Sequence, residues 1–172
     1  GERRASAGPR QALPKPTCPV IAMNDIESRL RRLEDREAIR TLVGTYALCL
    51  DDRDFAGLGA CFTEDAVFGP DDGGAGVQGR AAIIDRLRVL LATSVLSVHV
   101  NHDTFVSPSS DDPDSASGLV LCHAETSHGG HRISAIRYRD QYRRDEGQWR
   151  IAARRLRLVY SVAADTYAGS LV

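Results

Sequence analysis

Residues 131–160 read HRISAIRYRDQYRRDEGQWRIAARRLRLVY, and this stretch decides the fold class. Because successive side chains of a β-strand point to opposite faces, a strand with one buried face alternates between core and solvent residues. The first half shows this alternation, with arginines and a glutamine on one parity and, on the other, Ile136, Tyr138, Asp140 and Tyr142. Asp145-Glu146-Gly147 interrupts the pattern and is typical of a hairpin turn. The stretch therefore predicts two long antiparallel strands, at 131–144 and 148–160.

Two further strands are predicted before this hairpin, at about 95–107 and 116–127. Turn residues, including Gly129-Gly130, separate neighbouring strands, as expected for antiparallel connections. A helix is predicted at 80–92, because its apolar residues form one stripe at helical spacing: Ile83, Ile84, Leu87, Leu90 and Leu91.

The chain before residue 80 is predicted to be mainly helical. A long helix begins near Asn24 and carries a core-facing stripe of Ile39, Val43, Tyr46 and Leu50. Its apolar phase slips near Asp35, which predicts a bend or two helices. It is followed by a short helix capped by Asp54, a turn at 63–65 and a short strand at 66–68. Helices followed by long antiparallel strands make an α+β plan.

Composition sets the broad class. Residues 1–22 hold four of the chain's seven prolines and no periodicity, so they are predicted to be a disordered extension of one domain at 23–172. The net charge of −1 gives no general attraction to nucleic acid or to a membrane, and no apolar run approaches the roughly 18 residues of a spanning helix. The scattered cysteines form no CxxC pair, so neither a zinc site nor a disulfide framework is predicted, and a cytoplasmic location is expected.

Residues 137–157 contain eight arginines against three acidic residues. An arginine-rich sheet surface can bind nucleic acid, but such surfaces also expose aromatic side chains on the same face. Here the tyrosines take the opposite parity. The pattern favours a solvated outer face or a partner interface, and no nucleic-acid partner is predicted.

The stretch 98–105, VHVNHDTF, concentrates the candidate chemistry. Histidine titrates nearest neutrality and is the usual proton carrier, although two histidines on a strand are also compatible with a wet face. Strand alternation predicts that His99, Asn101 and Asp103 share one face and that His102 faces the other way. Because the two histidines point apart, they are not expected to chelate one metal ion. Asp51 directly follows core-facing Leu50 at a helix end, where a carboxylate opposes the helix dipole, so it is a candidate for an inward-facing functional group.

Several short motifs together resemble one family. They are REAIR at 36–40, CFTEDAV at 61–67, GRAAI at 79–83, YRDQY at 138–142 and GQWRI at 147–151. This set is similar to the SnoaL-like branch of the nuclear-transport-factor-like superfamily, whose relatives include polyketide cyclases, scytalone dehydratase and hexachlorocyclohexane dehydrochlorinase. The resemblance implies a cone-shaped, curved antiparallel sheet wrapped around about three N-terminal helices, with an apolar pocket at its open end. It also implies a homodimer or other homo-oligomer and no cofactor.

By position, the resemblance places Asp51 and His99 as a catalytic Asp–His pair. The predicted substrate-binding residues are Tyr46, Asn101, Asp103, His123 and Tyr138. For Tyr46, a purely structural place in the core is the alternative that its spacing favours.

Three functions are therefore open from the sequence. The first is a cofactor-independent enzyme of dehydratase, isomerase or cyclase type that acts on a small, apolar, oxygenated ring substrate. The second is a non-catalytic ligand-binding or accessory subunit of the same fold. The third is an epoxide hydrolase or epoxide-opening cyclase, which would need carboxylates around an activated water or an internal hydroxyl.

Overall fold

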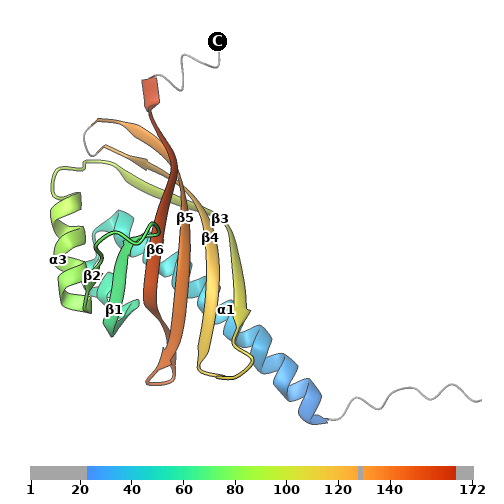
Figure 1. Cartoon of the computed structure of the whole chain (residues 1–172). Coiled ribbons are helices and arrows are strands. Elements are labelled where there is room, and N and C mark those ends of the chain that lie inside the picture. Colours follow the sequence, from blue (N-terminus) through green and yellow to red (C-terminus); the bar gives the residue numbers. More distant parts are fainter. Residues whose placement is uncertain (1–22, 128–129, 166–172) are drawn as a thin grey trace, which may run out of the picture.

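A computed structural model describes residues 23–127 and 130–165, so the whole predicted extension at 1–22 and the Gly129 position lie outside the described residues. The elements are α1 (Met23–Asp52), α2 (Phe55–Ala60), β1 (Phe62–Pro70), β2 (Val77–Gln78), α3 (Arg80–Leu91), β3 (Ser97–Pro108), β4 (Ser115–Thr126), β5 (Arg132–Asp145) and β6 (Gln148–Ala163). One six-stranded sheet has the order β2-β1-β6-β5-β4-β3, and only the β1–β6 pair is parallel. The sheet curves around α1, and the predicted α+β cone around three helices is confirmed (Figure 1).

The long helix α1 is continuous, so the predicted alternative of two helices meeting near Asp35 is wrong. The change in helical phase near Asp35 instead divides the apolar residues of α1 into two groups. Before it, Ile26, Leu30 and Leu33 are 52–60% exposed on a segment that projects past the sheet (Figure 1). After it, the predicted core stripe that includes Val43 and Leu50 is buried. Helical hydrogen bonding does not depend on which face is buried, so the change of face needs no break.

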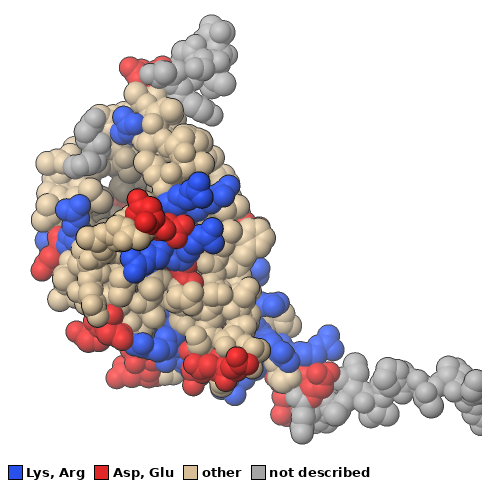
Figure 2. Space-filling model, in the orientation of Figure 1, with Lys and Arg blue, Asp and Glu red and all other residues tan. Residues whose placement is uncertain are grey.

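The predicted outer face of the sheet carries exposed arginines. Arg137 and Arg157 stand directly opposite each other on β5 and β6, and the Arg139 Nε donates a 2.9 Å hydrogen bond to Asp71 Oδ2. Figure 2 shows basic side chains gathered on this face with acidic ones beside them. The predicted solvated face is therefore observed for four of the eight arginines, at positions 137, 139, 143 and 157.

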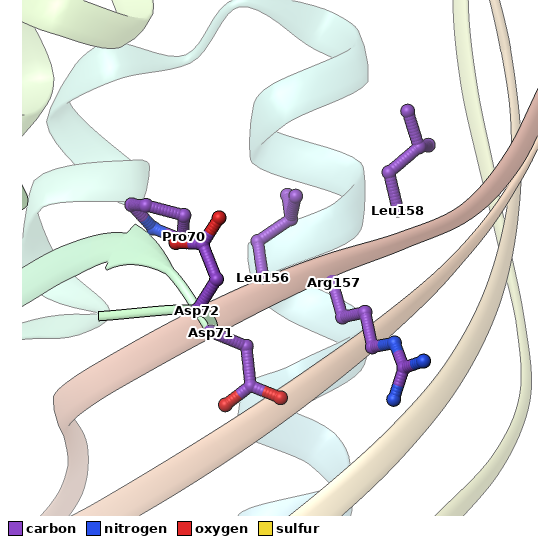
Figure 3. A pocket seen from close by; sticks show the side chains of 6 residues that line it. All are labelled: Pro70, Asp71, Asp72, Leu156, Arg157 and Leu158. Atoms are coloured by element: carbon purple, nitrogen blue, oxygen red, sulfur yellow. The ribbon is translucent and has the colours of Figure 1, made fainter. Parts of the chain in front are cut away.

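The sheet is open along β6 beyond the end of β1. The last parallel pair is Pro70 with Leu156, and a groove of about 540 Å³ begins there, lined by Pro70, Asp71, Asp72, Leu156, Arg157 and Leu158. Leu156 and Leu158 point to one side of β6 and Arg157 to the other (Figure 3). Strand pairing places the two leucines on the inner face of the sheet, beside Tyr138 and Ile136 of β5. The two leucines of the groove therefore belong to the inner face, and Arg157 belongs to the outer face.

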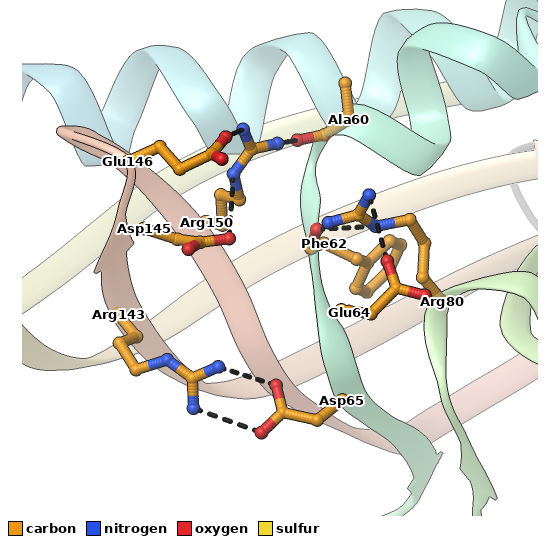
Figure 4. Close-up of polar contacts among 9 residues, drawn as sticks. All are labelled: Ala60, Phe62, Glu64, Asp65, Arg80, Arg143, Asp145, Glu146 and Arg150. Carbon is orange, nitrogen blue, oxygen red and sulfur yellow. Dashed lines mark hydrogen bonds and ion pairs between the residues drawn. The ribbon is translucent and has the colours of Figure 1, made fainter.

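Ion pairs tie the closed side of the sheet together. Both terminal nitrogens of Arg143 contact the Asp65 carboxylate, and the Arg150 Nη1 donates to the Ala60 carbonyl (Figure 4). These contacts join the β5–β6 hairpin to β1 and to the end of α2. The predicted turn at 63–65 is wrong, since these residues belong to β1, whereas Asp54 caps α2 as predicted by accepting from the Gly57 amide at 2.9 Å.

A buried ion pair lies at the centre of the core. Arg154 donates to both oxygens of Asp140, at 2.9 and 2.6 Å, and the two side chains are 1% and 0% exposed. Tyr142 donates to Asp140 Oδ2 at 2.7 Å, and the Arg154 guanidinium lies 4.1 Å from the Tyr46 ring centroid. Alternation correctly predicted the inward parity of Asp140. Arg154 differs from the outer arginines because the buried carboxylate requires a cation.

Replacing Arg154 by Met tests this pair. We expect the free energy of unfolding at pH 7 to fall by about 3–5 kcal/mol, because the buried Asp140 carboxylate loses its only ion-pair partner in the described chain. Urea titration followed by circular dichroism measures the change. The matched control is Arg157→Met on the exposed face, expected within about 0.5 kcal/mol of wild type. Equal stabilities for the two variants would contradict the assignment.

Candidate active site

The structure brings Asp51 and His99 together. Asp51 lies in the last turn of α1, directly after buried Leu50, and α1 packs on β3 there. The His99 Nδ1 lies 2.6 Å from Asp51 Oδ1, and the His99 backbone amide donates to Oδ2 at 2.7 Å. The Ser97 hydroxyl donates to Oδ1 at 2.9 Å. Both carboxylate oxygens are therefore held, and the helix end is joined to the start of β3.

This arrangement sets the protonation of the pair. Burial raises the pKa of Asp51, but the hydrogen bonds from His99 and Ser97 outweigh burial and hold the pKa below its ordinary value. An ionised carboxylate only accepts, so the neutral ring carries its proton on Nδ1 and presents a lone pair at Nε2. The His99 Nε2 has no hydrogen-bond partner among residues 23–127 and 130–165. The His99 side chain is 8% exposed, so this nitrogen is a sheltered, unpaired base.

Strand pairing identifies what surrounds His99 on the inner face. Its cross-strand row continues through Ala124 and Ser134 to Ser161. The next row inward begins with Asn101, and the row after that contains Tyr138. Leu158 of the groove ends the Asn101 row, three strands and roughly 14 Å across the sheet from β3. Leu158 of the groove and the Asp51–His99 pair therefore lie on the same face of the sheet.

Three of the predicted substrate-binding residues lie on this inner side. The Asn101 side-chain amide donates to the Val43 carbonyl of α1 at 3.4 Å. Tyr46 and Tyr138 lie deeper, with ring centroids 6.5 Å apart and edge to face, and Arg154 stacks on both rings. Burial raises the pKa of both tyrosines, so their hydroxyls remain neutral donors. The deep end of the inner face is therefore lined by aromatic rings and by the Arg154 guanidinium, whose charge is balanced by Asp140.

The other two, Asp103 and His123, lie outside, so their predicted place beside His99 is wrong. Asn101 pairs with Cys122 and Asp103 with Leu121, so His102 is an extra residue in β3 and the alternation shifts by one. After the bulge Thr104 is buried, whereas Asp103 is exposed. His123 is exposed too, on the outer face with His102. The bulge reverses the side on which Asp103 lies, and no local pattern predicted it. His123 faces outward by the ordinary alternation of β4, in which its neighbours Cys122 and Ala124 are buried.

Two inner-face features were not predicted. Ser97 shares the parity of His99, a signal that could have identified it. The second feature is a polar line at the open end, where the Ser134 and Arg132 side chains donate to the Ser161 hydroxyl at 2.9 and 2.8 Å. These residues of β5 and β6 can be recognised as neighbours only when the pairing register of the two strands is known.

Neither a metal cluster nor a membrane span is found in the described part of the chain. No three His, Cys, Asp or Glu side chains there are placed to hold one ion. No helix there is both long and apolar enough to cross a bilayer.

Comparisons with known proteins agree with this architecture. The family model of the SnoaL-like domain matches residues 31–155. Similar solved structures include a candidate scytalone dehydratase from Novosphingobium aromaticivorans (21% identity, TM-score 0.69, covering 77% of this chain and 89% of that one). Another is a type 2 hexachlorocyclohexane dehydrochlorinase, LinA (22% identity, TM-score 0.67, covering 78% of this chain and 91% of that one). A third is ActVI-ORFA from Streptomyces coelicolor (24% identity, TM-score 0.62, covering 72% of this chain and 96% of that one). At these identities the likeness shows the fold. No curated protein sequence matches the chain.

The lowered pKa of Asp51 predicts an acid-dependent contribution to stability. A carboxyl group with a pKa lower in the folded than in the unfolded state stabilises the fold above the unfolded value, near 3.9, and loses that effect as the pH falls through the folded value. We expect Asp51→Asn to cost about 2 kcal/mol at pH 7 and progressively less below about pH 4.

Urea unfolding of both proteins between pH 7 and pH 2.5 measures this difference. The control is Asp52→Asn, an exposed neighbour at the same helix end. A cost of Asp51→Asn that stays constant with pH would show that the carboxylate is not held by these hydrogen bonds.

Proposed function

Because the chain belongs to the SnoaL-like domain family, we propose that it is a cofactor-independent small-molecule enzyme in which Asp51 and His99 form a proton-transfer pair. The observation that carries the proposal is the His99 ring, held through Nδ1 by an ionised carboxylate while Nε2 is unpaired. An imidazole held in this way has a defined tautomer and a stabilised protonated form, which are the requirements of a general base.

The proposed reaction begins with proton transfer from carbon to the His99 Nε2. The C–H bond breaks, and its electron pair moves toward an adjacent carbonyl as an enolate forms. The nearby Asp51 carboxylate stabilises the imidazolium. In an elimination, the enolate expels a hydroxyl or other leaving group from the neighbouring carbon, and the imidazolium returns the proton to it. In an isomerisation, the proton returns to a different carbon. In a cyclisation, the carbanion attacks a second carbonyl of the same substrate, and the oxygen of that carbonyl takes the proton back from the imidazolium.

The inner face supports a small, largely apolar, oxygenated ring as the substrate. Leu156 and Leu158 line the opening, and Ile136 and Cys122 continue the row toward Asn101. We assign the neutral hydroxyls of Tyr46 and Tyr138 as donors to a substrate oxygen at the deep end. An enolate oxygen there would receive a stronger hydrogen bond than the ground-state carbonyl does, which lowers the barrier.

The epoxide alternative finds less support in the same geometry. Epoxide hydrolysis needs a carboxylate with an oxygen available to activate a water. Both oxygens of Asp51 already accept hydrogen bonds from β3, and Asp103 lies on the outer face. Asp51 is therefore better placed to orient His99 than to activate a water molecule.

Proton abstraction can be tested without the natural substrate by using 5-nitrobenzisoxazole. Removal of its ring C–H proton breaks the N–O bond and releases a coloured cyanophenolate. We expect turnover by the full chain above the buffer rate, and a loss of about 10²-fold or more in His99→Gln, because general-base catalysis contributes roughly that much. The increase in phenolate absorbance measures the rate.

The control is His131→Gln, which removes an exposed histidine paired with Glu125 and should leave the rate unchanged. If His99→Gln retains the wild-type rate, His99 is not the base. If the wild-type chain shows no turnover, the non-catalytic binder becomes the better interpretation.

A further inference from the structure

A second histidine cluster lies on the outer face of the sheet. The His102 Nε2 is 2.8 Å from the His123 Nδ1, and the two rings meet edge to face with centroids 4.7 Å apart. On its other side, the His123 Nε2 lies 3.1 Å from the Tyr160 hydroxyl. His123 and Tyr160 reach each other across β5 because the residue between them is Ala135, whose methyl group leaves the space open.

Two β-bulges build this cluster. His102 is the extra residue of β3, between the pairs Asn101–Cys122 and Asp103–Leu121. Val159 is the extra residue of β6, because Leu158 pairs with Ile136 and Tyr160 with Ala135. Bulges re-aim side chains and are common near functional sites. Both histidines are exposed, so the cluster is not a core feature, and it lies on the opposite face from His99.

We propose that His102 and His123 form a binding site for a divalent late first-row transition-metal ion, with Cu²⁺ preferred over Zn²⁺. Neighbouring imidazole nitrogens bound at about 2.0 Å and at right angles to one ion lie about 2.8 Å apart, whereas a tetrahedral ion separates them by about 3.3 Å. The observed 2.8 Å hydrogen-bond separation of the two nitrogens is close to both spacings, and the general affinity order of divalent ions at imidazole sites places Cu²⁺ above Zn²⁺. Since both side chains are exposed, the rings can turn to direct their lone pairs at one point.

Tyr160 completes the chemistry of the site. Without an ion, one ring nitrogen of the pair donates to the other, so a single proton lies between His102 and His123. When an ion takes that position, both facing nitrogens supply lone pairs, and each neutral ring keeps one N–H on its far nitrogen. For His123 the far nitrogen is Nε2, which then donates to the Tyr160 oxygen. Ligating histidines are commonly oriented by such a partner. Solvent fills the remaining coordination positions.

Titration of the full chain with Cu²⁺, followed by calorimetry and electron paramagnetic resonance, tests the site. We expect one ion bound per chain through His102 and His123, with two imidazole nitrogens coupled to it. His102→Gln and His123→Gln should each weaken binding at least tenfold, and Tyr160→Phe should weaken it about tenfold without changing the number of coupled nitrogens. Zn²⁺ should bind more weakly than Cu²⁺.

The control is His131→Gln, an exposed histidine outside the cluster, which should bind Cu²⁺ as the wild type does. Retention of wild-type affinity in His102→Gln or His123→Gln overturns the proposal, and so does a spectrum with fewer than two coupled imidazoles. Circular dichroism confirms that each variant is folded. Because the two sites lie on opposite faces, His102→Gln should leave 5-nitrobenzisoxazole turnover unchanged.

Discussion

The buried pair between Asp140 and Arg154 constrains the rest of the core. A carboxylate and a guanidinium without contact to water must satisfy each other, and the bidentate contact joins neighbouring strands β5 and β6 at their centre. The guanidinium then presents its faces to Tyr46 and Tyr138, which places α1 above the sheet. A helix fixed at Tyr46 has its C-terminal turn directed at the start of β3, where Asp51 meets His99. The ion pair is therefore connected to the proposed chemistry through one helix.

The Asp51 carboxylate shows how one side chain can serve structure and chemistry together. It accepts a backbone amide, a hydroxyl and an imidazole N–H from β3, so it docks the helix end that no basic residue caps. The same contacts keep it ionised and fix the tautomer of His99. A carboxylate at a helix C-terminus is unfavourable by itself, and the hydrogen bonds from the strand offset that cost.

His102, the single extra residue in β3, marks the point at which the inward-facing and outward-facing positions of the strand exchange. Before the bulge, alternate residues face the helix and include Ser97, His99 and Asn101. At the bulge, His102 stays outside and meets His123, and Asp103 remains outside with it. One insertion in the pairing thus leaves the proposed base His99 on the inner face and the proposed metal site at His102 and His123 on the outer face.

The sequence by itself determined the helices, the four long strands and their antiparallel hairpins, the inward parity of Asp140 and the candidacy of Asp51 and His99. These follow from local periodicity, turn residues and short motifs, which act over a few residues. Only the tertiary structure decided the partner of Asp140, the continuity of α1 and the outward placement of Asp103 and His123. The partner of Asp140 depends on a contact between residues far apart in the chain, and the placement of Asp103 depends on a register shift between strands. Because side chains alternate with a period of two, one unpaired residue reverses every assignment beyond it, and only the pairing of β3 with β4 reveals that residue.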